Sequence, residues 1–220
     1  MSSYGSAYRR AVARQLFMRG KRGYEAAVGG EFERFGALER EEVDSAGLPE
    51  NGFLIDVGCG AGRLAAALKG RPRLSYLGLD VSPSLIRKAR ETCARPDWRF
   101  ELVNRSAIPV PDGAADIISM FSLITHLPTV ETRAYIVDAA RALKKGGAVV
   151  VSFLDPELPE HRRMLRAPFI EAIVVNLFWA PNVASTKDDI RGYAREAGLE
   201  VEKIESPSNV GQSLAVLRKR

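Results

Sequence analysis

The chain has 220 residues, of which 46% are hydrophobic and 27% charged, and its net charge at pH 7 is +5. This length and composition are ordinary for a globular protein of one or two domains with a full core. The sequence has no run of 18 apolar residues and no leader-peptide pattern, and its two cysteines, Cys59 and Cys93, make neither a disulfide framework nor a metal site. We therefore expect a cytoplasmic protein.

Residues 1–47 predict a helical extension that precedes a main domain of residues 48–220. Residues 1–22 contain six Arg and Lys residues and no acidic residue, and their apolar side chains recur near helical spacing. A second helical pattern covers residues 31–46, with acidic side chains on the face that we expect to be exposed. A solvated basic helix packed over the domain is one interpretation of residues 1–22; a lid over a binding site is the other.

Strand and helix patterns then alternate along the main domain, which indicates a parallel sheet with right-handed crossovers. The expected strands are 53–57, 74–79, 99–103, 115–121 and 147–153, and the expected helices are 61–69, 83–93 and 129–143. A helix over 187–197 and two strands over 199–205 and 213–218 follow. The insert of residues 155–186 is broken by prolines, and its apolar stretch 169–179 is expected to be core, a pocket wall or a dimer face.

A glycine-rich turn follows the first strand, in the order Asp56-Val57-Gly58-Cys59-Gly60-Ala61-Gly62. Glycine permits positive φ and close backbone approach, so such a turn can wrap a ligand where a strand passes into a helix. A dinucleotide-binding turn would need Gly-x-Gly-x-x-Gly, but Arg63 stands at the third glycine position. A turn without any ligand is the other alternative. The observed order resembles the cofactor loop of the class I S-adenosylmethionine-dependent methyltransferases.

Further segments from residue 50 to 155 resemble the same family at near-family spacing. Asp80 ends the second strand, where the family's carboxylate accepts the ribose hydroxyls. Asn104 stands where the family usually has an Asp for the adenine amino group, and it keeps the carbonyl acceptor without the charge. The resemblance implies a seven-stranded, mostly parallel, doubly wound α/β sheet with the last strand antiparallel. It assigns to S-adenosylmethionine the residues Asp56, Gly58, Cys59, Gly60, Gly62, Asp80, Val81, Asn104, Arg105, Ser106 and Phe121.

Methyl transfer needs neither a protein nucleophile nor a metal, because the sulfonium carbon is already electrophilic. Positioning of the acceptor is the main requirement, and an oxygen acceptor can also need a general base. The chain has two histidines: His126 after the fourth strand and His161 in the insert. A structural role is the alternative for each. We predict His161 as the catalytic residue, because acceptors usually meet the methyl group at the insert in relatives.

Marks of other methyltransferase classes are missing from the sequence. Ser119-Met120-Phe121-Ser122 replaces the Asn/Asp-Pro-Pro-Tyr/Phe of amino-nitrogen enzymes, no Pro-Cys nucleophile occurs, and the fourth strand has no acidic metal ligand at its end. We therefore expect metal-independent methylation of a small molecule, most often at oxygen. An anionic or sugar metabolite is one acceptor that we expect.

An RNA acceptor is the second hypothesis. Basic residues outside the N-terminal helix that could extend an RNA-binding face are Lys144, Lys145, Arg162, Arg163 and Arg166. If the acceptor is RNA, these basic residues should line one open face. If the acceptor is a small metabolite, they should surround a closed site. A binding protein of this fold without catalysis is the third hypothesis.

Overall fold

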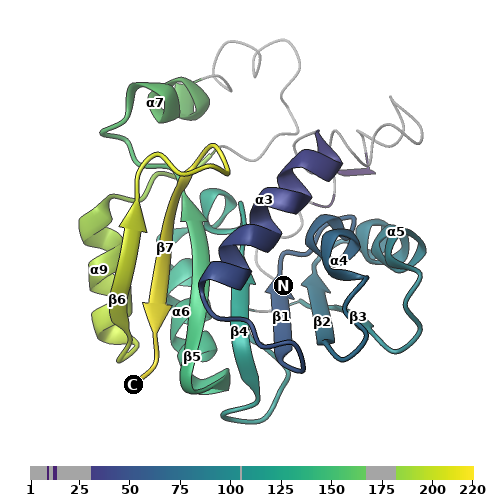
Figure 1. Cartoon of the computed structure of the whole chain (residues 1–220). Helices are drawn as coiled ribbons and strands as arrows, with labels where there is room; N and C mark the ends of the chain where they lie inside the picture. Colours follow the sequence, from purple (N-terminus) through teal and green to yellow (C-terminus); the bar gives the residue numbers. More distant parts are fainter. Residues whose placement is uncertain (1–8, 10–11, 14–30, 105, 167–181) are drawn as a thin grey trace.

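Seven strands form one mixed sheet in the computed structural model, which describes residues 9, 12–13, 31–104, 106–166 and 182–220 (Figure 1). The strand order is β3-β2-β1-β4-β5-β7-β6, and β7 alone runs opposite to the other six strands. The strands are β1 (Phe53–Val57), β2 (Ser75–Asp80), β3 (Arg99–Leu102), β4 (Ala115–Met120), β5 (Leu143–Phe153), β6 (Glu200–Glu205) and β7 (Ser213–Arg218). The predicted seven-stranded sheet with an antiparallel last strand is therefore confirmed.

Helices cover both faces of this sheet, as a doubly wound fold requires. The described helices are α3 (Phe32–Ser45), α4 (Arg63–Leu68), α5 (Pro83–Cys93), α6 (Thr129–Ala142), α7 (Pro159–Arg166), α9 (Lys187–Glu196) and the 3-10 turn η1 (Ile124–His126), and α7 lies beyond the end of the sheet. One buried cluster joins the sheet to α6 and α9 and includes Ile55, Ile118, Ile136 and Ile190. A second cluster joins the opposite face to α3, α4 and α5 and includes Leu54, Val43, Leu64 and Ile86. Successive residues of a strand point to opposite faces, so Leu54 and Ile55 belong to different clusters.

Local signals explain where several helices begin. The Ser82 hydroxyl accepts a hydrogen bond from Leu85 N at 3.5 Å, and Pro83 occupies the first helical position of α5. Thr186 and Asp189 form a reciprocal capping box at the start of α9. The start of β5 differs from the prediction of a strand over 147–153. Leu143 already pairs with Ala115 of β4, so the strand begins four residues earlier.

Helix α3 is part of the packed domain, although it lies within the predicted N-terminal extension. Val43 of α3 is fully buried in the second cluster. Glu39 and Glu42 are also buried, so the expected exposure of the helix's acidic residues is wrong at these two positions. Most of residues 1–30 and the apolar stretch 169–179 lie outside the described residues. Among the helices that are described, none is long and apolar enough to cross a membrane.

Candidate cofactor and acceptor site

The glycine turn wraps the carboxyl end of β2. Gly58 N and Cys59 N both donate to Leu79 O, at 2.7 and 3.0 Å. Gly58, Gly60 and Gly62 have φ values of +82°, +54° and +84°, which favour glycine at all three positions. The backbone of the turn therefore passes directly beside Asp80, the next residue of β2.

The Asp80 carboxylate is buried and is held by backbone groups on both sides. Gly60 N donates to Oδ2 at 3.1 Å, and Ser82 N donates to Oδ1 at 2.8 Å. Burial raises the Asp80 pKa to about 6, although these two hydrogen bonds act in the opposite direction. The group is thus mostly ionised at pH 7. Each carboxylate oxygen keeps further acceptor capacity, so the arrangement can accept two hydroxyl groups of a ribose.

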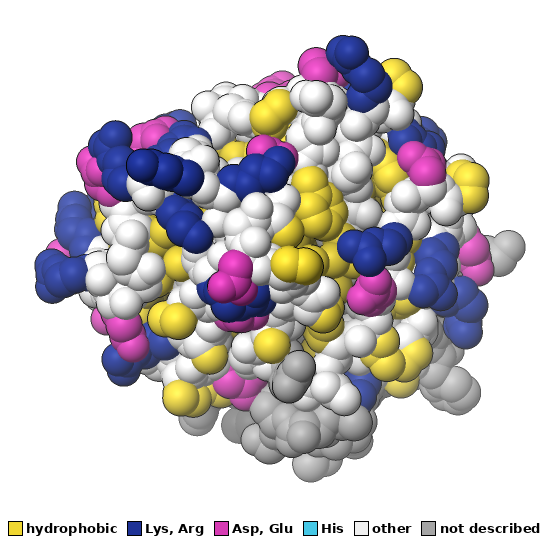
Figure 2. Space-filling view, turned by 90° about the horizontal axis from the view of Figure 1, so that it is seen from below, with side chains coloured by type: hydrophobic (Ala, Val, Ile, Leu, Met, Phe, Trp, Pro, Cys, Tyr) yellow, Lys and Arg dark blue, Asp and Glu magenta, His cyan; other side chains and the backbone are white. Residues whose placement is uncertain are grey.

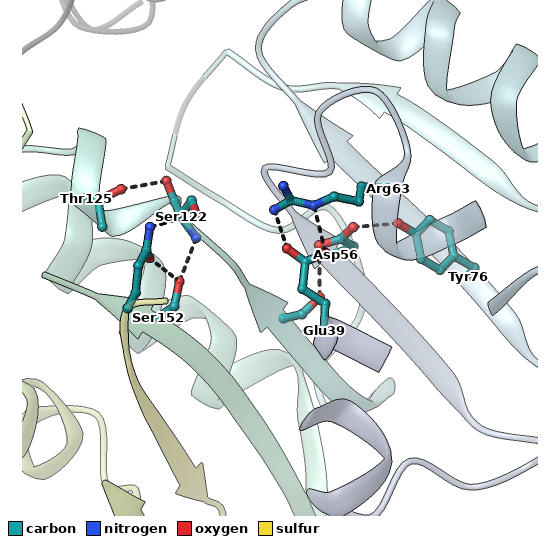
Figure 3. Close-up of polar contacts among 9 residues, drawn as sticks. Glu39, Asp56, Arg63, Tyr76, Ser122, Thr125 and Ser152 are labelled. Carbon is teal, nitrogen blue, oxygen red and sulfur yellow. Dashed lines mark hydrogen bonds and ion pairs between the residues drawn. The ribbon is translucent and has the colours of Figure 1, made fainter. Parts of the chain in front are cut away.

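Asp56 lies under the turn and is bound by side chains of the neighbouring strands (Figure 3). The Tyr76 hydroxyl of β2 donates to Asp56 Oδ2 at 2.6 Å, and Ser119 Oγ of β4 donates to Oδ1 at 2.9 Å. Burial raises the pKa of this carboxyl group. Asp56 therefore ties β1 to both of its neighbours directly beneath the turn, and a contact with the cofactor stays a prediction.

Glu39 and Arg63 connect α3 to the helix that follows the glycine turn. Arg63 Nε donates to Glu39 Oε2 at 3.2 Å, and a second guanidinium nitrogen pairs with Oε1. The Glu39 pKa is raised to about 7, because burial outweighs the opposing effect of the Arg63 charge. Glu39 was not predicted as a site residue, because the helical pattern placed the acidic residues of α3 in solvent.

The other predicted cofactor residues follow the ends of four neighbouring strands. Val81 is half-buried after β2, Asn104 is exposed after β3, and Phe121 is buried after β4. Ser106 Oγ donates to Glu131 Oε2 of α6 at 3.4 Å. Cys59 is buried, and burial raises its pKa well above the ordinary value, so it remains a thiol. Arg105 lies outside the described residues.

His161 of α7 is fully buried near the end of β5. Its Nδ1 accepts a hydrogen bond from Asp155 N at 2.9 Å, so the proton of the neutral ring resides on Nε2. This Nε2 is buried and has no hydrogen-bond partner among the described residues. In this arrangement His161 offers a donor, and its role as a general base stays a prediction. Burial lowers the pKa of His126 to about 4, which keeps that ring neutral at pH 7.

The basic residues proposed for an RNA face lie at opposite ends of the sheet. Lys144 is at the start of β5 and pairs with Asp116 at 2.7 Å, whereas Arg162 and Arg163 lie on α7, beyond the end of β5 (Figure 1). Figure 2 views the molecule from the end where β5 begins, and basic and acidic side chains are intermixed there. The described residues of this face therefore carry no concentrated basic surface. Nor do they include a group of three or more His, Cys, Asp or Glu side chains placed to hold a metal.

Comparison with known proteins agrees with the family resemblance of the sequence. A methyltransferase-domain model matches residues 54–147. The demethylmenaquinone methyltransferase of Tropheryma whipplei is 31% identical over 119 residues, which cover 53% of this chain and 45% of that protein. The trans-aconitate 2-methyltransferase of Variovorax paradoxus is 31% identical over 126 residues, covering 57% and 47%. The chain thus matches somewhat less than half the length of these curated relatives.

A solved structure extends the likeness in fold to nearly the whole chain. The TehB-like S-adenosylmethionine-dependent methyltransferase of Corynebacterium glutamicum superposes with a TM-score of 0.65 at 20% identity, covering 94% of this chain and 99% of that one. The matched segment contains the glycine turn and Asp80, and the strand order is that of the expected fold. Residues 54–147 of the chain therefore match a methyltransferase domain, and the chain has the fold of the class I S-adenosylmethionine-dependent methyltransferases.

Proposed function

We propose that this protein transfers a methyl group from S-adenosylmethionine to a small-molecule acceptor. The observation that carries the proposal is the Asp80 carboxylate, which two backbone N–H groups hold at the junction of the glycine turn and β2. A buried carboxylate costs free energy to maintain, and its free lone pairs need partners. The two hydroxyl groups of a ribose would supply them.

The remaining cofactor contacts follow from the order of the strands. The backbone of Gly58 and Gly60 would lie along the methionine part, and the Asn104 amide oxygen would accept from the adenine amino group. Phe121 and Val81 would pack beside the nucleoside. When bound, S-adenosylmethionine supplies an electrophilic methyl group, and the chain's own task is to orient the acceptor and exclude water.

A small acceptor is favoured over RNA by the placement of the basic residues. Lys144 and the pair Arg162 and Arg163 lie at opposite ends of the sheet, and Lys144 is already paired with Asp116. The two curated relatives named above carry small-molecule acceptors in their names. We assign the acceptor side to the insert, where His161 would donate from Nε2 to the acceptor. His161→Gln should lower kcat/KM for the acceptor and leave cofactor affinity unchanged.

Calorimetric titration with S-adenosylmethionine tests the cofactor assignment. Asp80→Ala should weaken binding at least about tenfold, because charge-assisted hydrogen bonds are each worth about 1.5–3 kcal/mol. Asp112→Ala is the matched control, since this exposed carboxylate pairs with Arg141 away from the glycine turn. Wild-type affinity in Asp80→Ala would refute the ribose assignment, and no binding to the wild-type protein would refute the proposed function.

A further inference from the structure

A closed ring of hydrogen bonds joins the carboxyl ends of β4 and β5 to the residue before β7. Ser122 N donates to Ser152 Oγ at 2.7 Å, Ser152 Oγ donates to Gln212 Oε1 at 2.8 Å, and Gln212 Nε2 donates to Ser122 Oγ at 3.0 Å. Figure 3 shows Ser122 and Ser152 in this ring. The three residues are far apart in the sequence, so the fold itself assembles the group.

Burial fixes the direction of the hydrogen bonds in the ring. Ser152 is 1% exposed, so its hydroxyl hydrogen needs a protein acceptor, and Gln212 Oε1 is the acceptor. The Gln212 amide nitrogen must then face Ser122. Two hydrogens are left over: the hydroxyl hydrogen of Ser122 and the second amide hydrogen of Gln212. Both residues are half-buried, and no described residue accepts either hydrogen.

The backbone of Ser122 is held in an uncommon conformation at this point. Its φ is +54°, a region that costs a residue other than glycine about 1–2 kcal/mol. The surroundings hold it there, because Ser122 N and Oγ are bonded in the ring and Thr125 Oγ1 donates to Ser122 O at 2.8 Å. The structure thus keeps the Ser122 hydroxyl in one place.

The ring adjoins both the glycine turn and the insert. The side chain of Leu123, next to Ser122, packs so closely on the turn that a Cβ at Gly58 would lie 3.1 Å from Leu123 Cδ1. On the other side, Val183 N of the insert donates to Thr125 O at 2.7 Å. A molecule that meets the methyl group between the turn and the insert would therefore lie beside the two spare donors.

We propose that the Ser122 hydroxyl and the Gln212 amide bind an sp² oxygen of the methyl acceptor. Two neutral donors side by side fit the oxygen of a carboxylate or of a carbonyl group. The acceptor class is therefore a carboxylate or carbonyl compound, and Ser122 and Gln212 determine this specificity. The inference rests on the proposed methyl transfer, because it places the donors beside the cofactor turn.

Nuclear magnetic resonance on the protein loaded with S-adenosylhomocysteine tests the donor pair directly. Gln212 is one of two glutamines in the chain, so the ¹⁵N signal of its amide can be assigned from its loss in Gln212→Glu. Sodium acetate and acetone serve as small probes for a carboxylate and a carbonyl oxygen. Methylammonium chloride at the same concentration is the control without an acceptor atom.

We expect acetate, acetone or both to shift the Gln212 amide signal, which also tells the two classes apart, while methylammonium leaves it in place. Ser122→Gly removes one donor and suits the positive φ, so the variant should fold as stably as the wild type. The probe should bind it about 3–10-fold more weakly, the usual effect of one neutral hydrogen bond.

Three results would overturn the inference: a Gln212 signal that neither probe moves, a shift with methylammonium, or equal probe affinity in Ser122→Gly. Calorimetry with S-adenosylhomocysteine on the same sample separates this failure from the other one. If S-adenosylhomocysteine binds but no probe shifts the Gln212 amide signal, only the donor pair is refuted. If S-adenosylhomocysteine does not bind, the proposed function is refuted.

Discussion

Gly62 is the position where one added methyl group should disturb the cofactor turn most. Its φ is +84°, and a Cβ atom there would lie 3.0 Å from Ala89 Cα, 3.1 Å from Ala89 Cβ and 3.2 Å from Ala89 O. Two of these atoms are backbone of α5, so they can move only if the helix moves. Gly62→Ala therefore adds overpacking, about 1–3 kcal/mol, to the strain of a left-handed residue, about 1 kcal/mol.

Gly146 provides a matched control for the strain alone. Its φ is +80°, and no atom of the described residues lies within 4 Å of a Cβ placed there. Gly146→Ala should lower the free energy of unfolding by about 1 kcal/mol, and Gly62→Ala by about 2–4 kcal/mol. Urea unfolding followed by circular dichroism, without cofactor, measures both. Equal losses would mean that the turn and α5 separate easily, and the close packing argument would be refuted.

Four further predictions concern the charges under the turn and the N-terminal segment. Asp80 must be ionised to accept both ribose hydroxyls, so cofactor affinity should fall as the pH drops below about 6, and in Asp80→Asn it should be weaker and independent of pH. The raised Glu39 pKa means that its contribution to stability is complete below pH 4.5 and lost as the pH rises through about 7. In urea unfolding, the wild type should therefore lose about 3 kcal/mol relative to Glu39→Gln between pH 4.5 and about pH 8, and parallel curves would contradict this. Tyr76→Phe should cost about 1–3 kcal/mol of unfolding free energy, because buried Asp56 loses a hydrogen-bond donor while the ring keeps its stacking on Trp98. Deletion of residues 1–22 should leave a cooperatively melting domain that binds cofactor weakly and turns over little if the segment is a lid; unchanged affinity and turnover would make it a passive appendage.

The sheet was predictable because its signals are local. Strands that are buried on both faces appear in the sequence as short apolar runs, such as residues 148–153. The capping residue Ser82 and the following Pro83 predict the start of a helix, and α5 begins there in the structure. The early part of β5 was not predictable in this way. Lys144 and Gly146 look like a turn, but Gly146 N donates to Lys219 O at 2.8 Å, and this partner lies far away in the sequence. Helix α7 was missed because prolines on both sides made the insert look irregular.

The same distinction applies to the candidate site: residues in local motifs could be predicted from the sequence, and residues whose role depends on a distant partner could not. The glycine turn and Asp80 were predicted, since the turn is one continuous motif and Asp80 ends the next strand. Glu39 and Gln212 were not, because each acquires its role from a partner elsewhere in the chain: Arg63 for Glu39 and Ser122 for Gln212. A helical pattern assigns an acidic residue to solvent by default, and only the packing of α3 on α4 shows that Glu39 is buried.

The buried carboxylates give an independent reason to regard this end of the sheet as a binding site. Burial raises the pKa of Glu39, Asp56 and Asp80, and the charge of Asp56 raises the other two further. A domain that had only to fold would gain stability by replacing such groups with apolar ones, since each ionised carboxylate is costly to bury. Perturbed groups of this kind concentrate where a protein binds or reacts. The fold keeps all three directly around the glycine turn, and Asp80 is the one whose oxygens are held by backbone donors alone. Asp80 is therefore the carboxylate with acceptor capacity to spare for a ligand, whereas Asp56 and Glu39 hold the strands and helices that position it.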